Sequence, residues 1–183
     1  MGRPKANTSK QSATEKIERA FWEILEKEGY ENLSILRLSQ ETTLNRNSIY
    51  YHYKNLEDIA HKAIDHPIDD DTVLYFISVL IARQFDALLS PDMSDKRKKI
   101  HLLAKSDAPF LKTSLKNHLL KTWFSYFHID SNKLSDLDNL TLDFITSGLI
   151  TLLGNESFLT DPSAFPSTEI GKATLHTLQQ LSR

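Results

Sequence analysis

The sequence predicts an all-α protein, and three observations lead to this prediction. The 183 residues include only 5 glycines and 6 prolines, which leaves few breaks in long helices. Apolar residues recur at spacings of three and four through most of the chain, as they do along one face of a helix. No stretch alternates apolar and polar residues convincingly enough for a strand. We therefore expect roughly eight or nine helices joined by short links.

The start of the chain predicts a basic arm followed by an amphipathic helix. Residues 1–10 carry three basic residues and no acid, as expected of a flexible arm. Ser12 and Glu15 match a capping box, which satisfies the free N–H groups at a helix start. Gly29 is expected to end the helix in the left-handed αL conformation. Its apolar stripe contains Ile17, Ala20, Phe21, Ile24 and Leu25.

Three short helices are expected next, each with its own cap. Ser34 begins the first, and Thr42-Thr43 ends it because two threonines continue a helix poorly. Asn45 is a good N-cap for the second, and Asn55 caps the third.

The remaining helices are longer and more apolar. They are expected over 72–89, 95–105, 109–128, 134–153 and 169–182, with a loop over 154–168. The basic run 96–99 is expected to form a solvated face, and the alternative is non-specific contact with DNA. We accordingly divide the chain into an arm (1–10), a domain of short helices (11–66) and a larger helical domain (67–183).

Composition excludes several classes of protein. The chain has no cysteine, which rules out a disulfide framework, a thiolate metal site and a cysteine nucleophile. No apolar run approaches the roughly 18 residues that suggest a transmembrane helix. The polar, basic start MGRPKANTSK is unlike a signal peptide. We therefore expect a cytoplasmic protein with no membrane partner.

The residues 34–53 carry the main functional signal. Two short capped helices with a tight link are the arrangement of a helix-turn-helix. Side chains of the second helix that would face outward can hydrogen-bond base edges or phosphates. They are Arg46, Asn47, Ser48, Tyr51 and His52. Short polar helices also occur in many all-α proteins, so this pattern alone leaves both interpretations open.

Residues 17–64 resemble the N-terminal module of the TetR family of transcriptional repressors. The matching features, in order, are the AFWEIL stripe, Gly29-Tyr30, the cap Ser34, Ile35 and Leu38, Asn45, the run Tyr50-Tyr51-His52-Tyr53, and Glu57-Asp58-Ile59. The rest of the chain is similar to the family only in its helical architecture. The resemblance implies a dimeric repressor that binds a double-stranded DNA operator and is released from it by a small-molecule effector.

The sequence departs from the family pattern at three places. Thr42-Thr43 stands where the family usually has Ala-Gly, and a non-glycine residue at positive φ costs about 1 kcal/mol, so we expect an adjusted turn. Asn47-Ser48 stands where a small Gly or Thr is expected, which adds donors that face DNA. Leu56 stands where a Lys is common, so that phosphate contact is either lost or taken over by Lys54.

Each candidate DNA-binding residue has an expected role. Arg46 and Asn47 would read base edges, since Arg suits guanine and Asn suits adenine. Ser34 would cap its helix and bind phosphate through the helix N-terminus, whereas Tyr50 would either contact phosphate or pack. The predicted set is Ser34, Arg37, Asn45, Arg46, Asn47, Ser48, Tyr50, Tyr51, His52 and Lys54, with Arg3 and Lys5 from the arm. The alternative for the arm is a tail that only keeps the protein soluble.

The C-terminal domain is expected to supply the dimer contact and the effector pocket. The helix 134–153 is apolar around much of its circumference, so it needs cover on more than one side. The resemblance implies that it and the 169–182 helix pair with their copies, although it could instead be the core helix of a monomer. The candidate pocket residues are Phe76, Phe85, His101, His118, Trp123 and Phe127. Aromatic residues at helical spacing are more often core.

No pattern in the sequence indicates catalysis. A Gly-rich phosphate loop, HExxH and G-x-S-x-G are absent, and the 7 histidines lack metal-ligand spacing. We therefore expect neither an enzyme nor a metal or cofactor site. The remaining alternative is a helical adaptor that uses the same module for protein contacts, without an effector.

The net charge of −2 hides a sorted distribution of charge. Residues 1–10 carry +3, and residues 34–54 carry three basic residues against one acid, or +2. Residues 11–33 carry three basic residues against six acids, or −3. The positive segments are those expected to face DNA, which predicts a modest, salt-sensitive binder.

Overall fold

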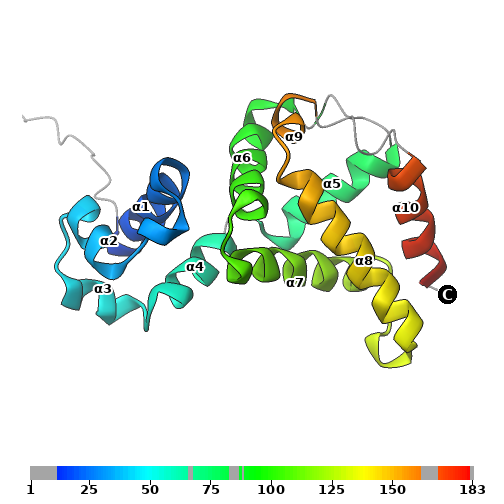
Figure 1. The fold of residues 1–183 in the computed structure, drawn as a ribbon, viewed down its shortest axis with the longest axis horizontal. Coiled ribbons are helices and arrows are strands. Elements are labelled where there is room, and N and C mark those ends of the chain that lie inside the picture. The colour runs from blue at the N-terminus through cyan, green and yellow to red at the C-terminus, as the bar shows by residue number, and fades with distance from the viewer. Residues whose placement is uncertain (1–11, 66–67, 83–86, 88, 162–168, 182–183) are drawn as a thin grey trace, which may run out of the picture. The chain divides into compact units, whose positions relative to one another are not determined.

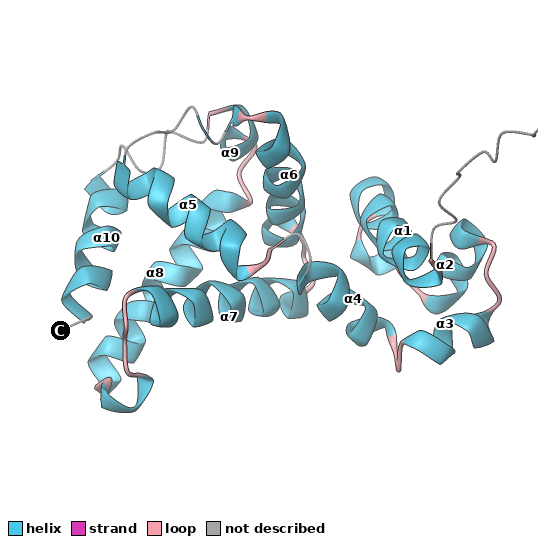
Figure 2. Cartoon of the chain, turned by 180° about the vertical axis from the view of Figure 1, so that it is seen from behind, coloured by secondary structure: helices cyan, strands magenta, loops and turns pink. Residues whose placement is uncertain are grey.

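The computed structural model describes residues 12–65, 68–82, 87, 89–161 and 169–181, and in them the all-α prediction is confirmed (Figures 1 and 2). The described chain contains ten α-helices and no strand. It divides into two compact units, Met1–Ala63 and Ile64–Arg183, and the division falls within the fourth helix. No described helix has both the length and the apolar character needed to cross a membrane.

The first unit is built around α1 (Ala13–Glu28), which packs against α2 (Ile35–Thr42) and α3 (Arg46–His52). The predicted capping box is confirmed: Glu15 N donates to Ser12 Oγ at 3.2 Å, and Ser12 N donates to the Glu15 carboxylate at 2.9 Å. The core of the unit is formed by fully buried apolar side chains of all three helices. They are Ile17, Phe21, Ile24, Leu38 and Ile49.

Gly29 ends α1 as predicted, but not in the expected conformation. Its φ of 82° is positive, whereas its ψ of 168° lies outside the αL region. The chain therefore leaves α1 in an extended direction and enters the short 3₁₀ helix η1 (Tyr30–Asn32). Positive φ still explains why glycine stands here, since a Cβ would be strained.

The link between α2 and α3 is held by two threonines. Thr42 Oγ1 donates to Leu38 O at 2.7 Å and accepts from Leu44 N at 3.3 Å, which ends α2. Thr43 then takes the left-handed conformation, with φ 58° and ψ 15°. The turn is thus made at positive φ without a glycine.

Caps also fix the starts of α3 and of α4 (Leu56–Asp65). Asn45 Oδ1 accepts from Ser48 N at 2.8 Å, and Asn55 Oδ1 accepts from Asp58 N at 2.8 Å. Both predicted N-caps are confirmed.

The second unit packs α6 (Pro91–Lys105), α7 (Pro109–Tyr126) and α8 (Asp136–Leu153) against one another. The helix α5 (Asp70–Ala82) lies against α7, and the one-turn helix α9 (Ser157–Thr160) lies against α6. The 3₁₀ helix η3 (Ser131–Lys133) precedes α8, and α10 (Glu169–Leu181) is the last described element.

The structure differs most from the predicted bounds at the start of α6 and within the predicted loop 154–168. The helix α6 begins at Pro91, since proline is favoured in the first turn, where its missing N–H has no partner to lose. The predicted loop 154–168 contains α9, which is too short to show a helical period in the sequence. The end of the predicted 72–89 helix falls partly outside the described residues.

Candidate nucleic-acid interface

Two buried side chains anchor α3 in the first unit. Ile49 is fully buried, and Tyr53, which follows the helix, is 2% exposed. The Tyr53 hydroxyl donates to Glu18 Oε1 of α1 at 3.1 Å, and burial raises the pKa of that hydroxyl. The helix is therefore held at its middle and at its C-terminal end, which fixes the direction of its outer side.

The outer side of α3 presents four large polar or aromatic side chains. Arg46 and Asn47 are exposed in its first turn, Tyr50 is 55% exposed and Tyr51 is 85% exposed. Tyr50 was expected either to contact phosphate or to pack. Its exposure shows that it does not pack in the core. We call Arg46, Asn47, Tyr50 and Tyr51 the α3 outer face.

The other predicted residues of α3 are engaged within the protein. Asn45 Oδ1 accepts from both the backbone N–H and the hydroxyl of Ser48, the latter at 3.1 Å. His52 is half-buried, and its ring lies edge-on to Tyr51, with ring centroids 5.0 Å apart. Asn45, Ser48 and His52 therefore help to position α3. Any contact that they make with DNA would be a second role.

Arg37 is held by two carboxylates. Its guanidinium donates to Glu28 at 2.6 and 3.1 Å and lies 2.8 Å from Glu41. Hydrogen bonds to Glu28 and then Glu41 raise the pKa of Arg37, and the same contact lowers the pKa of Glu28. Arg37 thus joins α1 to α2, and a phosphate would compete with two acids for it.

Polar groups also lie at the N-terminus of α2 and after α3. The exposed Ser34 caps α2, with its Oγ accepting from Arg37 N at 3.1 Å. The exposed Lys54 donates its backbone N–H to Asp58 Oδ2 at 2.9 Å. Arg3 and Lys5 lie outside the described residues.

Sequence reasoning missed Lys62 of α4. Its Nζ lies 4.9 Å from the centre of the Tyr53 ring and 3.4 Å from His52 O. It therefore adds a positive charge at the C-terminal end of α3. The i,i+4 spacing of Asp58 and Lys62 predicts an ion pair within α4, and the two side chains do pair at 3.7 Å. That spacing cannot predict the contact of Lys62 with the end of α3, because it concerns one helix only.

The predicted effector-pocket residues are only partly described, and those that are described have different neighbours. His101 Nδ1 lies 3.0 Å from Leu153 O, and its Nε2 lies 3.5 Å from Glu156. His118 Nε2 lies 3.8 Å from Asp70 and has no hydrogen-bond partner among the described residues. Burial lowers the pKa of His118. Trp123 and Phe127 are buried in the core. Phe85 and the side chain of Phe76 lie outside the described residues.

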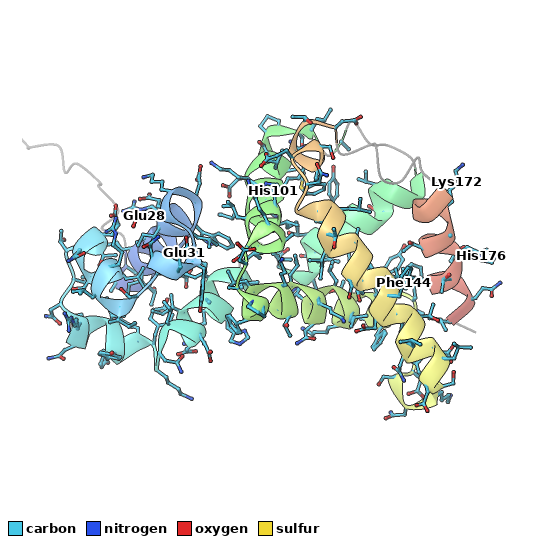
Figure 3. The ribbon with its side chains drawn as sticks, in the orientation of Figure 1. Glu28, Glu31, His101, Phe144, Lys172 and His176 are labelled. Carbon is cyan, nitrogen blue, oxygen red and sulfur yellow. The ribbon has the colours of Figure 1, made fainter. Side chains whose placement is uncertain are left out.

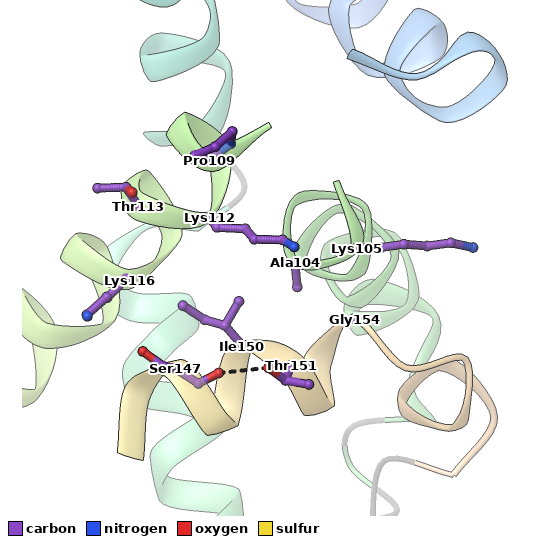
Figure 4. A pocket seen from close by; sticks show the side chains of 10 residues that line it. All are labelled: Ala104, Lys105, Pro109, Lys112, Thr113, Lys116, Ser147, Ile150, Thr151 and Gly154. Atoms are coloured by element: carbon purple, nitrogen blue, oxygen red, sulfur yellow. Dashed lines mark hydrogen bonds between the residues drawn. The ribbon is translucent and has the colours of Figure 1, made fainter. Parts of the chain in front are cut away.

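A different set of residues lines a groove in the second unit. Its volume is about 570 Å³, and it lies where α6 ends, α7 begins and α8 passes (Figure 4). The four predicted pocket residues whose side chains the structure describes, His101, His118, Trp123 and Phe127, do not line it. Its lining is Ala104, Lys105, Pro109, Lys112, Thr113, Lys116, Ser147, Ile150, Thr151 and Gly154.

The helix α8 buries one side and exposes large apolar residues on the other. Leu142, Thr146 and Ile150 are buried. Leu137, Leu140 and Phe144, at 72%, 66% and 79% exposure, form what we call the α8 apolar face (Figure 3 labels Phe144). A Cβ at Gly148, one turn beyond Phe144, would have no atom within 4 Å.

The basic run 96–99 is the expected solvated face only in part, because Lys98 is exposed and Lys96 and Lys99 are half-buried, whereas Arg97 is buried. Arg97 is 6% exposed, and its guanidinium donates to Leu159 O of α9 at 3.2 Å. Burial lowers the pKa of Arg97. The buried side of α6 includes Met93, Arg97 and Ile100, so helical spacing places the arginine inward although its sequence neighbours are all basic.

The part of the chain that the structure describes contains no group of three or more histidine, aspartate or glutamate side chains arranged to hold a metal ion. Comparison of the chain with models of protein families, with curated proteins and with solved structures finds no match.

Proposed function

We propose that the protein is a sequence-specific DNA-binding transcriptional regulator of the TetR type, a dimeric repressor that a small-molecule effector releases from its operator. In this proposal α2 and α3 form the helix-turn-helix, and α3 enters the major groove. The α3 outer face carries the proposal, because a short helix anchored by Ile49 and Tyr53 presents polar and aromatic side chains outward. The sequence resemblance over residues 17–64 supports it.

The side chains of the α3 outer face suit this task. An exposed arginine and asparagine at the start of a recognition helix can form paired hydrogen bonds to guanine and adenine. Tyr50 and Tyr51 would contact phosphates or thymine methyl groups, and Ser34 at the start of α2 would bind a phosphate. Lys62 adds a cation at the other end of α3.

The dimer is proposed to form through α8 and α10. A single short helix discriminates too little, so helix-turn-helix proteins usually read two half-sites as symmetric dimers. The α8 apolar face supplies an exposed surface of the kind that a second copy would cover. The open space at Gly148 would let a second helix approach closely.

Effector binding would act by a shift between two populations of the dimer. One population holds its two recognition helices at the spacing of successive major grooves, about 34 Å, and the other does not. An effector that binds the second population better would release the DNA.

The test is binding of the full-length protein to a duplex taken from upstream of its own gene, with a shuffled duplex as control. Fluorescence anisotropy should give a dissociation constant near about 10 nM for the upstream duplex and much weaker binding to the shuffled one. Affinity should fall between about 50 and 200 mM salt. An adaptor protein would show no preference between the two duplexes, and that result would overturn the proposal.

A further inference from the structure

We propose that the groove between α6, α7 and α8 is a binding site for a small organic anion, a carboxylate or phosphate monoester on an apolar body. Its volume of about 570 Å³ is within the range of about 300–1,000 Å³ that is common for small-molecule sites. All three helices belong to the second unit and pack directly against one another.

The charge of the lining selects an anion. Three lysines line the groove, Lys105 from α6 and Lys112 and Lys116 from α7, and no carboxylate is among the described residues of the lining. A concave surface that carries one sign of charge concentrates ions of the opposite sign. The N-terminus of α7, which lacks a side-chain cap, adds partial positive charge at the same place.

Lys112 is the lysine that remains available to a ligand. Lys105 pairs with Glu156 at 2.6 Å, and Lys116 pairs with Asp143, and neither acid lines the groove. For Lys112 the described residues supply no ion-pair partner. Its side chain extends from α7 across the groove toward Ala104 of α6 (Figure 4). An ammonium group in that position can meet an anion without breaking an existing pair.

The rest of the lining provides both hydroxyl groups and apolar side chains. Thr113 and Ser147 bring hydroxyl groups, whereas the hydroxyl of Thr151 already donates to Ser147 O at 3.0 Å. Ala104, Pro109 and Ile150 are apolar. An anionic group at Lys112 would thus place its attached ring or chain on Ile150, which inorganic phosphate could not do.

The shape of the groove is fixed where α8 ends. A Cβ at Gly154 would lie 3.0 Å from the carbonyl oxygen of Ala104, so the backbones of α6 and α8 approach closely there. A preformed site loses less conformational entropy when it binds a ligand.

The experiment measures binding to the full-length protein without DNA, so its outcome does not depend on the function proposed above. Isothermal titration and chemical-shift titration would use benzoate, phenyl phosphate and the neutral benzamide. We expect at least one of the two anions to bind saturably below about 10 mM, with benzamide at least about tenfold weaker. The stronger anion identifies which of the two chemical groups the site takes.

Lys112→Gln should weaken binding of that anion at least about tenfold, because it removes the charge and keeps a polar side chain that is only slightly shorter. Lys121→Gln is the matched control: Lys121 is on the same helix, is 71% exposed and lies outside the lining, so its loss should leave affinity within about twofold. Saturation by neither anion, equal binding of benzamide, or equal effects of the two variants would overturn the proposal.

Discussion

The side chains at the start of α3 divide between those that hold the helix and those that can meet DNA. Asn45 and Ser48 hydrogen-bond to each other in the cap, whereas Arg46 and Asn47 between them are exposed. This alternation follows from the helical turn, because residues in one turn point in different directions. The proposed base contacts are therefore confined to a few side chains.

Arg46 and Lys54 should differ in how their loss affects DNA binding. Arg46→Ala should relax preference at one base position, at about 1–3 kcal/mol, because an arginine to guanine contact is specific. Lys54→Ala should weaken all sequences alike and reduce the salt slope by about one, because a phosphate contact carries no sequence information. Competition by duplexes with single base changes, at several salt concentrations, separates the two effects. Unchanged operator binding by Arg46→Ala would mean that the register of α3 on DNA is wrong.

Thr43 should be a site where glycine stabilises the protein. Its φ of 58° is unfavourable for a β-branched residue. Glycine relieves this strain, and the free energy gained exceeds the cost of the extra conformational entropy that glycine gives the unfolded chain. Thr43→Gly should raise the free energy of unfolding by about 0.5–1 kcal/mol in urea titrations. Gln40→Gly, an exposed position inside α2, is the control and should lower it by a similar amount. A destabilised Thr43→Gly variant would contradict this account of the turn.

At the scale of elements, the pairing of Arg37 with Glu28 links the end of α1 to α2 and should make stability depend on pH. Arg37 lowers the pKa of Glu28 below its ordinary value of 4.5, so the folded state favours the charged carboxylate. The stabilisation is therefore present above pH 4.5 and is lost as the pH falls through the lower folded pKa.

Glu28→Gln should consequently be less stable than the natural protein at neutral pH, with a gap that closes at acidic pH. Urea unfolding between about pH 7 and pH 3 measures this difference. The exposed Glu31→Gln controls for the loss of one negative charge. If the difference in the free energy of unfolding between Glu28→Gln and the natural protein stays constant from about pH 7 to about pH 3, the ion pair is not the cause of that difference.

Local signals predicted the elements well, and tertiary contacts account for what they missed. The caps at Ser12, Asn45 and Asn55 were predictable because each depends on residues three apart. The pairing of Arg37 with Glu28 and the inward side of Arg97 depend on which helix lies opposite, and the sequence does not encode that locally. The lysine groove was missed for the same reason, since its lining comes from three helices.

At the scale of the molecule, the α8 apolar face should control assembly. Phe144→Lys places a charge on this face, so sedimentation velocity should show a monomer. Circular dichroism should show that the helix content is unchanged. Leu89→Lys changes a large apolar residue that is 50% exposed outside α8, and it should remain dimeric. A dimeric Phe144→Lys variant would place the proposed interface elsewhere. The monomer should also lose the affinity that comes from two half-sites.

The arrangement of charge, and not its total, agrees with the proposed function. A net charge of −2 gives no general attraction to DNA, but residues 34–54 carry +2 and contain the α3 outer face. Acids gather on α1, where Glu28 and Glu18 hold Arg37 and Tyr53. Because few cations are available, binding should depend on specific contacts more than on charge alone.

The most direct test of the central claim is selection of binding sites by the full-length protein from a pool of random duplex DNA. The account predicts enrichment of one palindromic sequence whose half-sites lie about 10 base pairs apart or a small multiple of that spacing. It also predicts that Arg46→Ala selects the same palindrome with one symmetric position randomised. A pool that stays random after repeated selection, with protein that is folded and dimeric, would contradict it.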